Sequence, residues 1–418
     1  MKQRLIFHID VNSAFLSWTD RERRLHNPEL PGLLTIPAAF GGDSSKRHGI
    51  VLAKSPAARA MGVTTGEPLA SALKKCPNLS VFPPDFKVYA RNSAALMELL
   101  YGFSPVLQQF SIDEAFLDMT DTIHLFGEPL PAAERLRMKI EHELGFTVNI
   151  GISSNKLLAK MASDFEKPNR CHTLFPEEIP KKMWPLPTGE LYLVGRSARA
   201  KLALMGIRTI GELARADLSL LQPHLGVKYG AMIRQYANGE DDSPVEPEEP
   251  ESKGIGNRTT LSHDVTDFED ACQILLLLSE SVGARLRKSG RKCSCITVER
   301  RDADFHNSSH QLTLPSPTCS TGMIYDTSVR LLREFWNGTP LRLLGVRVSR
   351  LDDPAFEQLS LFPSEESRKQ EKQEKVDRAI DAIRERFGTD AVRRASVLSA
   401  HLPPAPEKNK GSFPPPLT

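Results

Sequence analysis

The chain has 418 residues, of which 40% are hydrophobic and 25% are charged, and its formal net charge is +2. At about 100 to 200 residues per domain this length predicts several domains, and the composition is typical of a folded protein rather than a disordered one. The near-neutral charge excludes a protein that is basic throughout, so any surface for nucleic acid has to be local.

Neither a membrane span nor a structural metal site is indicated by the sequence. No run of about 18 apolar residues occurs, and His8 and Asp10 interrupt the first apolar segment before it reaches signal-peptide length. The six cysteines form no CxxC pair, which argues against a zinc site and a disulfide framework. We therefore expect a cytoplasmic protein with reduced thiols.

Short strands and helices of a mixed α/β domain are predicted in the first 175 residues. The segment RLIFHIDV (residues 4–11) is an apolar strand that ends near Asp10, and FTVNIGIS (146–153) is a second strand rich in β-branched residues. Between them, ARNSAALMELLYGF (90–103) has a helical pattern.

The segment FSIDEAFLDMT (110–120) places Asp113 and Glu114 in a run that otherwise predicts a buried strand. Burying an unpaired carboxylate is costly, so the pair needs a cation, a hydrogen-bond network or a bend toward water. Neighbouring strand residues point to opposite faces, so a shared role for both acids requires a bend or bulge. The alternatives are a lysine partner for one acid, or a solvated hairpin.

Two short helices joined by a tight turn are predicted from residue 191 onward. Gly206 is expected to cap the first helix, and Thr209 with Glu212 forms a capping box that opens the second. The hairpin between them, which we place around VGRSARAK (194–201), offers backbone N–H groups to phosphates. The acidic, proline-containing segment GEDDSPVEPEEPES (239–252) has the composition of a linker.

A β-α-β-β-α-β unit is predicted after this linker. Its first helix is expected to start at a capping box of Thr266 and Glu269 and to stop at Gly290. The four strands are expected at KGIGNRTTL (253–261), CSCITVER (293–300), HQLTL (310–314) and LRLLGVRVSRL (341–351). A charged helix with an apolar stripe follows, formed by Val376, Ile380, Ile383 and Phe387.

Three segments, HIDVNSAF, SIDEAFLD and GISSNKLLAKMASDFEKPN, resemble the palm motifs of the Y-family DNA polymerases of the bacterial polymerase IV type. The resemblance continues through the paired helices and the β-α-β-β-α-β unit to QLSLF. It implies an α+β multidomain, right-hand-like polymerase with palm, small fingers, helix-hairpin-helix thumb and little finger. The expected domains are palm 1–13 and 85–175, fingers 14–84, thumb 176–239, acidic linker 240–252, little finger 253–352 and tail 353–418.

The resemblance implies template-directed, error-prone translesion synthesis that adds dNTPs to a primer. Two-metal phosphoryl transfer needs carboxylates that hold two Mg²⁺ ions roughly 3.5 to 4 Å apart. Mg²⁺ prefers hard oxygen ligands and usually takes one or two carboxylates. Asp10, Asp113 and Glu114 supply these ligands and are the implied catalytic and metal-binding residues.

The resemblance also assigns residues to the incoming nucleotide. Lys167, just before Pro-Asn, and Arg59 are expected to contact the triphosphate, and Phe15 is expected to exclude ribose as a steric gate. Departures from the family pattern occur beside them. Pro56 replaces a tyrosine that often contacts the triphosphate, and Asn12 stands where many members have an acid.

Primer-template DNA and the β sliding clamp are the expected partners of a monomeric enzyme, with no membrane. Expected DNA contacts are Arg196, Arg199 and Lys201 in the thumb, and Arg285, Arg287, Lys288, Arg291 and Lys292 in the little finger. The last five belong to a run with seven basic residues and one acid (284–301), although such a run can also be a solvated helix end. The expected clamp motif is Gln358, Leu359, Leu361 and Phe362.

Two other functions are considered. A catalytically silent relative would act as a clamp-binding and DNA-binding adaptor, but the chain keeps all three acids. A palm-like nucleotidyl cyclase would share the carboxylates without needing the thumb helices or the clamp motif. Primer extension separates the three functions.

Overall fold

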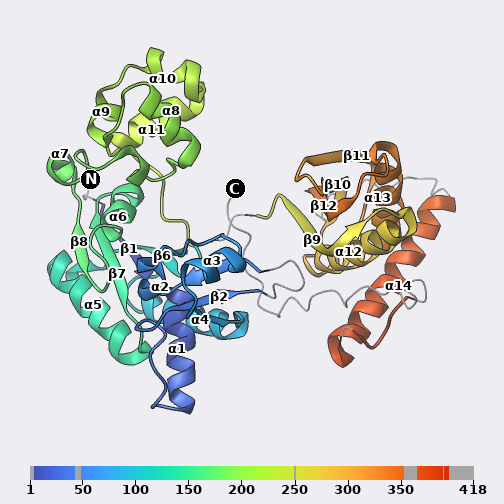
Figure 1. Cartoon of the computed structure of the whole chain (residues 1–418), viewed down its shortest axis with the longest axis horizontal. Helices are drawn as coiled ribbons and strands as arrows, with labels where there is room; N and C mark the ends of the chain where they lie inside the picture. The colour runs from blue at the N-terminus through green and yellow to red at the C-terminus, as the bar shows by residue number, and fades with distance from the viewer. Residues whose placement is uncertain (1–3, 43–48, 249–250, 353–364, 389, 395–418) are drawn as a thin grey trace. The chain divides into compact units, whose positions relative to one another are not determined.

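The computed structural model describes residues 4–42, 49–248, 251–352, 365–388 and 390–394, and the chain divides into two compact units near residue 250 (Figure 1). Each unit has its own hydrophobic core. Within these described ranges, no helix combines the length and apolar character that crossing a bilayer requires.

The first unit contains a five-stranded sheet in the order β5-β6-β1-β7-β8. Its strands are β1 (Ile6–Val11), β5 (Leu107–Gln109), β6 (Glu114–Asp118), β7 (Val148–Ser153) and β8 (Cys171–Thr173). The central strand β1 pairs antiparallel with both β6 and β7. Phe7, Ile9 and Val11 point to one face of the sheet, where α4 (Phe86–Tyr101) and α5 (Pro129–Leu144) complete the core. His8 and Asp10 therefore point to the other face.

Helix α6 (Lys156–Ser163) covers the face to which His8 and Asp10 point. It packs directly on β7 at Gly151, where an added Cβ would lie 1.9 Å from the carbonyl oxygen of Ala159. Only glycine permits this close approach of helix and strand. This close packing brings Lys160 of α6, and Lys167 just after α6, to the end of β1 that carries Asp10.

A smaller sheet, in the order β3-β2-β4, lies between β1 and α4 in sequence. Its elements are β2 (Ala38–Gly41), β3 (Val51–Lys54), β4 (Ser80–Phe82), α2 (Pro56–Ala60) and α3 (Leu69–Lys75). Helix α1 (Ala14–His26) follows β1 and contacts both α4 and this sheet. Residue 15, just inside α1, is thereby fixed between two cores.

Short helices form the rest of the first unit: α7 (Ile179–Lys182), α8 (Arg196–Leu204), α9 (Ile210–Arg215), α10 (Leu218–Leu225) and α11 (Val227–Ala237). The expected capping box is confirmed, because Thr209 accepts a hydrogen bond from the Glu212 N–H and Glu212 accepts one from the Thr209 N–H. Gly206 has a φ of 79° and forms the turn between α8 and α9, as expected.

The second unit confirms the predicted β-α-β-β-α-β order. Its elements are β9 (Gly254–Val265), α12 (Phe268–Lys288), β10 (Lys292–Asp302), β11 (Asn307–Thr318), α13 (Thr321–Phe335) and β12 (Leu341–Asp352). The sheet is antiparallel, in the order β11-β10-β12-β9. The predicted capping box is wrong by one residue, because Asp267 accepts hydrogen bonds from the N–H groups of Glu269 and Asp270. A carboxylate can accept from both orphan donors at once.

Helix α14 (Glu365–Phe387) presents acids, not its apolar stripe, to its own unit. Asp377 is 2% exposed, and Arg287 of α12 pairs with both Asp377 and Asp381. Asp377 also accepts a hydrogen bond from the N–H of Thr321 at the start of α13. Much of the predicted stripe is exposed: Val376, Ile383 and Phe387. Charge pairing rather than apolar burial therefore holds this helix.

Candidate active site

Three acidic residues lie at one end of the β1–β6 pair. Asp10 and Glu114 are direct partners in the antiparallel register, so their side chains project from the same face of the sheet. Asp113 ends a bend over residues 111–113, and its carbonyl oxygen accepts a 3.0 Å hydrogen bond from the Val11 N–H. The bend that a shared role of Asp113 and Glu114 requires is therefore present.

Two lysines, one in α6 and one just after it, pair with two of these acids. Lys160 Nζ is 2.6 Å from Glu114 Oε2, and Lys167 Nζ is 3.0 Å from Asp10 Oδ1. A lysine partner, one of the alternatives for an acid in this motif, thus exists for Glu114. Asp113 has no ion pair with a residue in the described ranges, and its carboxylate accepts a 2.6 Å hydrogen bond from the Ser111 hydroxyl.

The three carboxyl groups differ strongly as acids. Burial raises the pKa of Asp10 to about 7, opposed by the charge of Lys167 and helped by that of Glu114. Burial also raises the pKa of Asp113. Burial acts in the same direction on Glu114, but the His8 ring and the Lys160 ammonium outweigh it and lower this pKa to about 2. Burial makes it costly to keep several neighbouring carboxylates ionised, and a bound cation would offset that cost. The cluster is therefore a candidate cation site.

His8 and Lys160 lie at this candidate site, and the sequence patterns did not identify them. His8 is fully buried, with Nδ1 2.7 Å from the Ser163 hydroxyl and Nε2 3.4 Å from Glu114 Oε2. Burial lowers the pKa of His8, so the ring is neutral near pH 7. Its position two residues before Asp10 on one strand was the available signal, but a strand register is needed to show that it faces Glu114.

Phe15 lies at the start of α1, five residues after Asp10. Its half-buried ring stacks on Tyr89 of α4, with ring centroids 4.5 Å apart and planes 19° apart. Tyr89 is fully buried, so the Phe15 ring rests on a rigid support. The structure thus places the expected gate residue on the chain segment that leaves the carboxylate cluster.

Arg59 is exposed on α2 and, in the part of the chain that the structure describes, has no hydrogen bond or ion pair to the carboxylates. The pKa of Lys54 is lowered mainly by burial and, to a smaller extent, by the positive charge of Arg59. Two cations are therefore close together at this edge of the small sheet. Among the described residues, no hydrogen bond or ion pair joins Arg59 to Asp10 or Asp164, the partners of Lys167.

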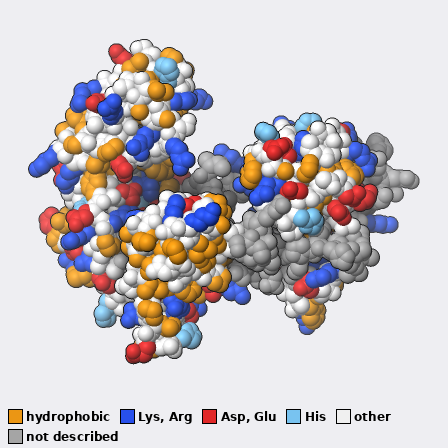
Figure 2. Space-filling view, viewed as in Figure 1, with side chains coloured by type: hydrophobic (Ala, Val, Ile, Leu, Met, Phe, Trp, Pro, Cys, Tyr) orange, Lys and Arg blue, Asp and Glu red, His pale blue; other side chains and the backbone are white. Residues whose placement is uncertain are grey.

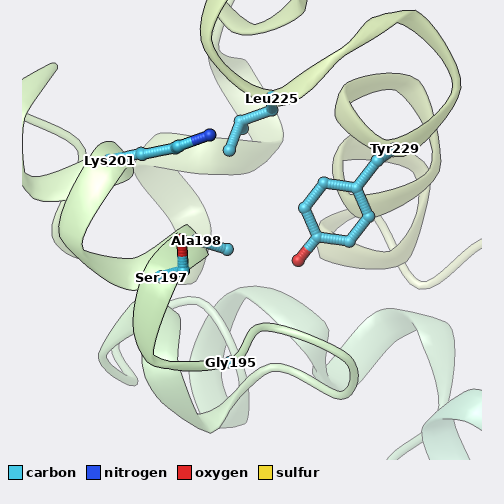
Figure 3. Close-up of a pocket in the computed structure, with 6 residues that line it drawn as sticks. All are labelled: Gly195, Ser197, Ala198, Lys201, Leu225 and Tyr229. Carbon is cyan, nitrogen blue, oxygen red and sulfur yellow. The ribbon is translucent and has the colours of Figure 1, made fainter. Parts of the chain in front are cut away.

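The three expected thumb contacts lie on α8, and all are exposed: Arg196, Arg199 and Lys201. The N-cap residue is Gly195, which has no side chain with which to cap the first N–H groups of α8. A cavity of about 270 Å³ adjoins this helix start (Figure 3). Lys201 and Ser197 line it from α8, and Tyr229 of α11 faces them.

The expected placement of the VGRSARAK hairpin between two helices is wrong. Residues 196–204 are one continuous helix, with a first bond from the Arg199 N–H to the Gly195 carbonyl. No glycine or proline interrupts this helix, so the turn between the paired helices lies instead at Gly206. The phosphate-binding potential therefore belongs to the start of α8, not to a hairpin.

The basic run of the second unit is divided over several places. Arg287 is buried against α14, Arg291 donates to the carbonyl oxygens of Ser252 and Leu351, and Lys292 lies 3.8 Å from Glu374. Arg285, which donates to the Gly256 carbonyl, and Lys288 stay exposed. Figure 2 shows acidic and basic side chains intermingled on the visible face of this unit. The five basic residues expected to contact DNA are therefore not equally exposed.

Two further groups complete the candidates. The clamp motif, Gln358 to Phe362, lies outside the described residues. Asp302, Asp304 and His306, at the turn between β10 and β11, place ligand atoms within 4.8 Å of one another. These side chains lie in the second unit, and the Asp302 carboxylate already accepts the His306 N–H.

Known protein families match most of the chain. The impB/mucB/samB family matches residues 9–164, its C-terminal domain matches residues 252–361, and the thumb domain of DNA polymerase-iota matches residues 190–241. The chain is 44% identical to DNA polymerase IV of Clostridium acetobutylicum over 395 residues, which cover 94% of this chain and 98% of the relative. It is 36% identical to DNA polymerase IV 1 of Bacillus subtilis over 400 residues, covering 95% and 94% of the two chains.

A solved structure shares the fold. The chain superimposes on a Y-family DNA polymerase chimera with a TM-score of 0.72 at 22% identity, covering 83% of this chain and 99% of that one. The predicted fold class, with palm, fingers, thumb and little finger, is confirmed by this similarity together with the thumb-domain match.

Proposed function

The chain belongs to the impB/mucB/samB family of Y-family DNA polymerases and is a DNA-directed DNA polymerase of the translesion type, and from this we propose that Asp10, Asp113 and Glu114 hold two Mg²⁺ ions for nucleotide addition. The observation that supports this most is the register of Asp10 opposite Glu114, with Asp113 at the adjoining bend. All three offer hard carboxylate oxygens, which fit Mg²⁺.

The bound ions would activate the attacking oxygen of the primer and stabilise charge on the leaving group. The protein residues supply the rest. Lys160 and His8 keep Glu114 ionised, so that a ligand is ready at neutral pH. Lys167 Nζ lies 3.0 Å from Asp10 and 2.8 Å from Asp164, which places a mobile cation beside the cluster, where a triphosphate would bind. We infer that Arg59 adds a second contact and that Phe15 closes the sugar pocket.

Metal binding at Asp10 predicts a pH-dependent release of protons. Because burial raises the pKa of Asp10 to about 7, an entering cation must displace the proton from part of the molecules near neutral pH. Titration with Mn²⁺ on a pH-stat should release roughly half a proton from Asp10 near pH 7 and almost none near pH 9. Asp10→Asn should remove this release, whereas Asp118→Asn, on the same sheet, should not. Equal release by Asp10→Asn and wild type would contradict the assignment.

We propose that the start of α8 and its basic residues bind the DNA backbone without reading sequence. A helix start without an N-cap side chain and three exposed cations suit phosphate oxygens, although Lys201 also donates a 2.9 Å hydrogen bond to the His224 carbonyl. In the little finger, Arg285 and Lys288 are exposed, whereas Arg287, Arg291 and Lys292 are only partly exposed and contact acids or carbonyls of their own unit. We therefore assign the larger share of backbone contacts to the thumb.

Lys201→Ala should weaken binding of primer-template DNA several-fold, equally for unrelated sequences. One lost phosphate contact should also reduce the slope of log affinity against log salt concentration by about one. Fluorescence anisotropy at several salt concentrations measures both quantities. Lys139→Ala, which removes an exposed lysine from α5, is the matched control. An unchanged salt slope in Lys201→Ala would remove this residue from the DNA-binding surface.

We propose that residues 358–362 recruit the β sliding clamp. The segment follows the last strand of the second unit, and apolar residues outside a core suit a partner's pocket. Deleting Gln358 to Phe362 should abolish clamp binding in a pull-down and leave distributive synthesis on a short primer-template intact. Replacing the same five residues with glycine and serine controls for chain length. Loss of distributive synthesis in both variants would indicate a folding role instead.

The expected domain boundaries, a monomeric state and a cytoplasmic location are part of this proposal. The elements of the first unit are compatible with palm (1–13 and 85–175), fingers (14–84) and thumb (176–239). Curated relatives named DNA polymerase IV favour the enzyme over the silent adaptor and the cyclase. Error-prone synthesis is inferred from the family.

A further inference from the structure

Asn149 is a buried polar residue in the middle of the palm sheet. It lies on β7 directly opposite Asp10 of β1 and is 0% exposed. Because Glu114 is the partner of Asp10 on the other side, Glu114, Asp10 and Asn149 form one row across three strands, on one face. A buried neutral amide at the end of a row of acids needs hydrogen-bond partners of its own.

The amide of Asn149 uses all four of its hydrogen-bonding positions. Its Nδ2 donates to the carbonyl oxygens of Ser163, at 3.1 Å, and Glu166, at 2.9 Å. Its Oδ1 accepts from Asn12 Nδ2 at 3.1 Å and from the Arg170 N–H at 3.3 Å. Two donors and two acceptor positions are the full capacity of an asparagine side chain.

Three of these four bonds go to the backbone of the segment 163–170, on both sides of Lys167. Asn12 adds a fourth backbone contact, because its Oδ1 accepts a 2.8 Å hydrogen bond from the Asn169 N–H. The bonds to fixed backbone groups also set the orientation of both amides. The side chains of Asn149 and Asn12 thus bind the segment 163–170 to the sheet. Lys167 lies between the residues that they bond.

We propose that Asn149 is a positioning residue for the incoming nucleotide, which holds the Lys167 segment so that the ammonium stays beside the carboxylates. The inference rests on the proposed contact of Lys167 with the triphosphate. Smaller or differently charged side chains lose these bonds: aspartate lacks both donors, leucine lacks all four groups, and alanine removes a partner from the Ser163 and Glu166 carbonyls and from the Arg170 N–H. Of the two carbonyls, that of Glu166 keeps a second contact, 3.0 Å from His172 Nε2. Asn12, at a position where many family members carry an acid, supports the same segment through its bonds to Asn149 and to the Asn169 N–H.

Single-turnover insertion of one nucleotide tests the inference. Asn149→Ala should raise the Kd for dNTP about tenfold, with a change in the maximal rate of less than about threefold and unchanged affinity for primer-template. Asn149→Ser, which keeps one polar group, should fold well and show a smaller shift in the same direction. The matched control is Asn92→Ala, which removes another buried asparagine, in α4, that donates to the Val88 carbonyl and accepts from Arg21. It should leave the Kd for dNTP unchanged even if it lowers Tm.

A double-mutant cycle with Lys167→Ala shows whether Asn149 acts through the lysine. In a Lys167→Ala background, Asn149→Ala should raise the Kd for dNTP by less than about twofold. Effects that multiply, or an Asn149→Ala enzyme with wild-type Kd, would overturn the inference while leaving Lys167 in its role.

Hydrogen exchange of the peptide 163–170 separates the inference from the proposed function. Exchange in this peptide should be faster in Asn149→Ala than in wild type or Asn92→Ala. If Lys167→Ala leaves the Kd for dNTP unchanged while Asn149→Ala loosens the peptide, the triphosphate role of Lys167 fails and Asn149 is only a structural support. If the peptide exchanges as in wild type, Asn149 does not hold the segment.

Discussion

Asp10→Asn should lower the single-turnover rate of nucleotide addition by about a thousandfold or more, because it removes the charge of a carboxylate that we place at the metal ions. The change keeps the size of the side chain. It also removes a buried group that is already protonated in part near pH 7, so the fold should not be destabilised strongly. The loss of activity should therefore occur without a matching loss of Tm.

The control for Asp10→Asn is Asp118→Asn. Asp118 lies at the other end of β6 from Glu114, and its carboxylate accepts hydrogen bonds from Thr120. This substitution removes a carboxylate from the same sheet without changing the cluster. It should leave the rate of nucleotide addition within about threefold of wild type. Asp10→Asn activity within about tenfold of wild type would show that Asp10 is not a ligand needed for the reaction.

Phe15→Ala should raise insertion of ribonucleotides relative to deoxyribonucleotides by about a hundredfold. The Phe15 ring is held by stacking on Tyr89, so it cannot move aside easily for a 2′-hydroxyl. Removing the ring opens the space that this hydroxyl would occupy. The measurement is kcat/KM for rNTP and for the matching dNTP on one template, and the ratio of the two values is the result.

Phe103→Ala is the matched control for the gate. Phe103 stacks on Phe126 with ring centroids 4.7 Å apart and planes 19° apart, much as Phe15 stacks on Tyr89. Its removal costs a similar aromatic contact at a distance in sequence from α1. We expect lower Tm and unchanged sugar selection. A Phe15→Ala enzyme that still rejects rNTP as wild type does would assign sugar selection to another residue.

Local patterns predicted the order of elements well. The apolar strand before Asp10, the capping box at Thr209 and the β-α-β-β-α-β unit all follow from residues near one another in sequence. Hydrophobic periodicity and cap residues predict such elements, because both depend on residues close together in sequence. The bend at Asp113 was also anticipated, because adjacent strand residues cannot share a face without one.

The errors arose where distant residues decide the structure. The apolar stripe of α14 was visible in the sequence, but the face that packs on the second unit was not, because Arg287, about ninety residues earlier in the chain, pairs with Asp377 and Asp381. For the same reason, the partners of Glu114, which are His8 and Lys160, became visible only from the register of β1 and β6 and the close packing of α6. Sequence patterns carry no information on such pairs without a fold.

Anomalous diffraction from Mn²⁺ in crystals with primer-template DNA and a non-hydrolysable dNTP tests the metal assignment most directly. We predict two peaks in contact with carboxylate oxygens of Asp10, Asp113 and Glu114, and no second peak in Glu114→Gln. Peaks confined to another group of ligands, such as Asp302, Asp304 and His306, would contradict the account.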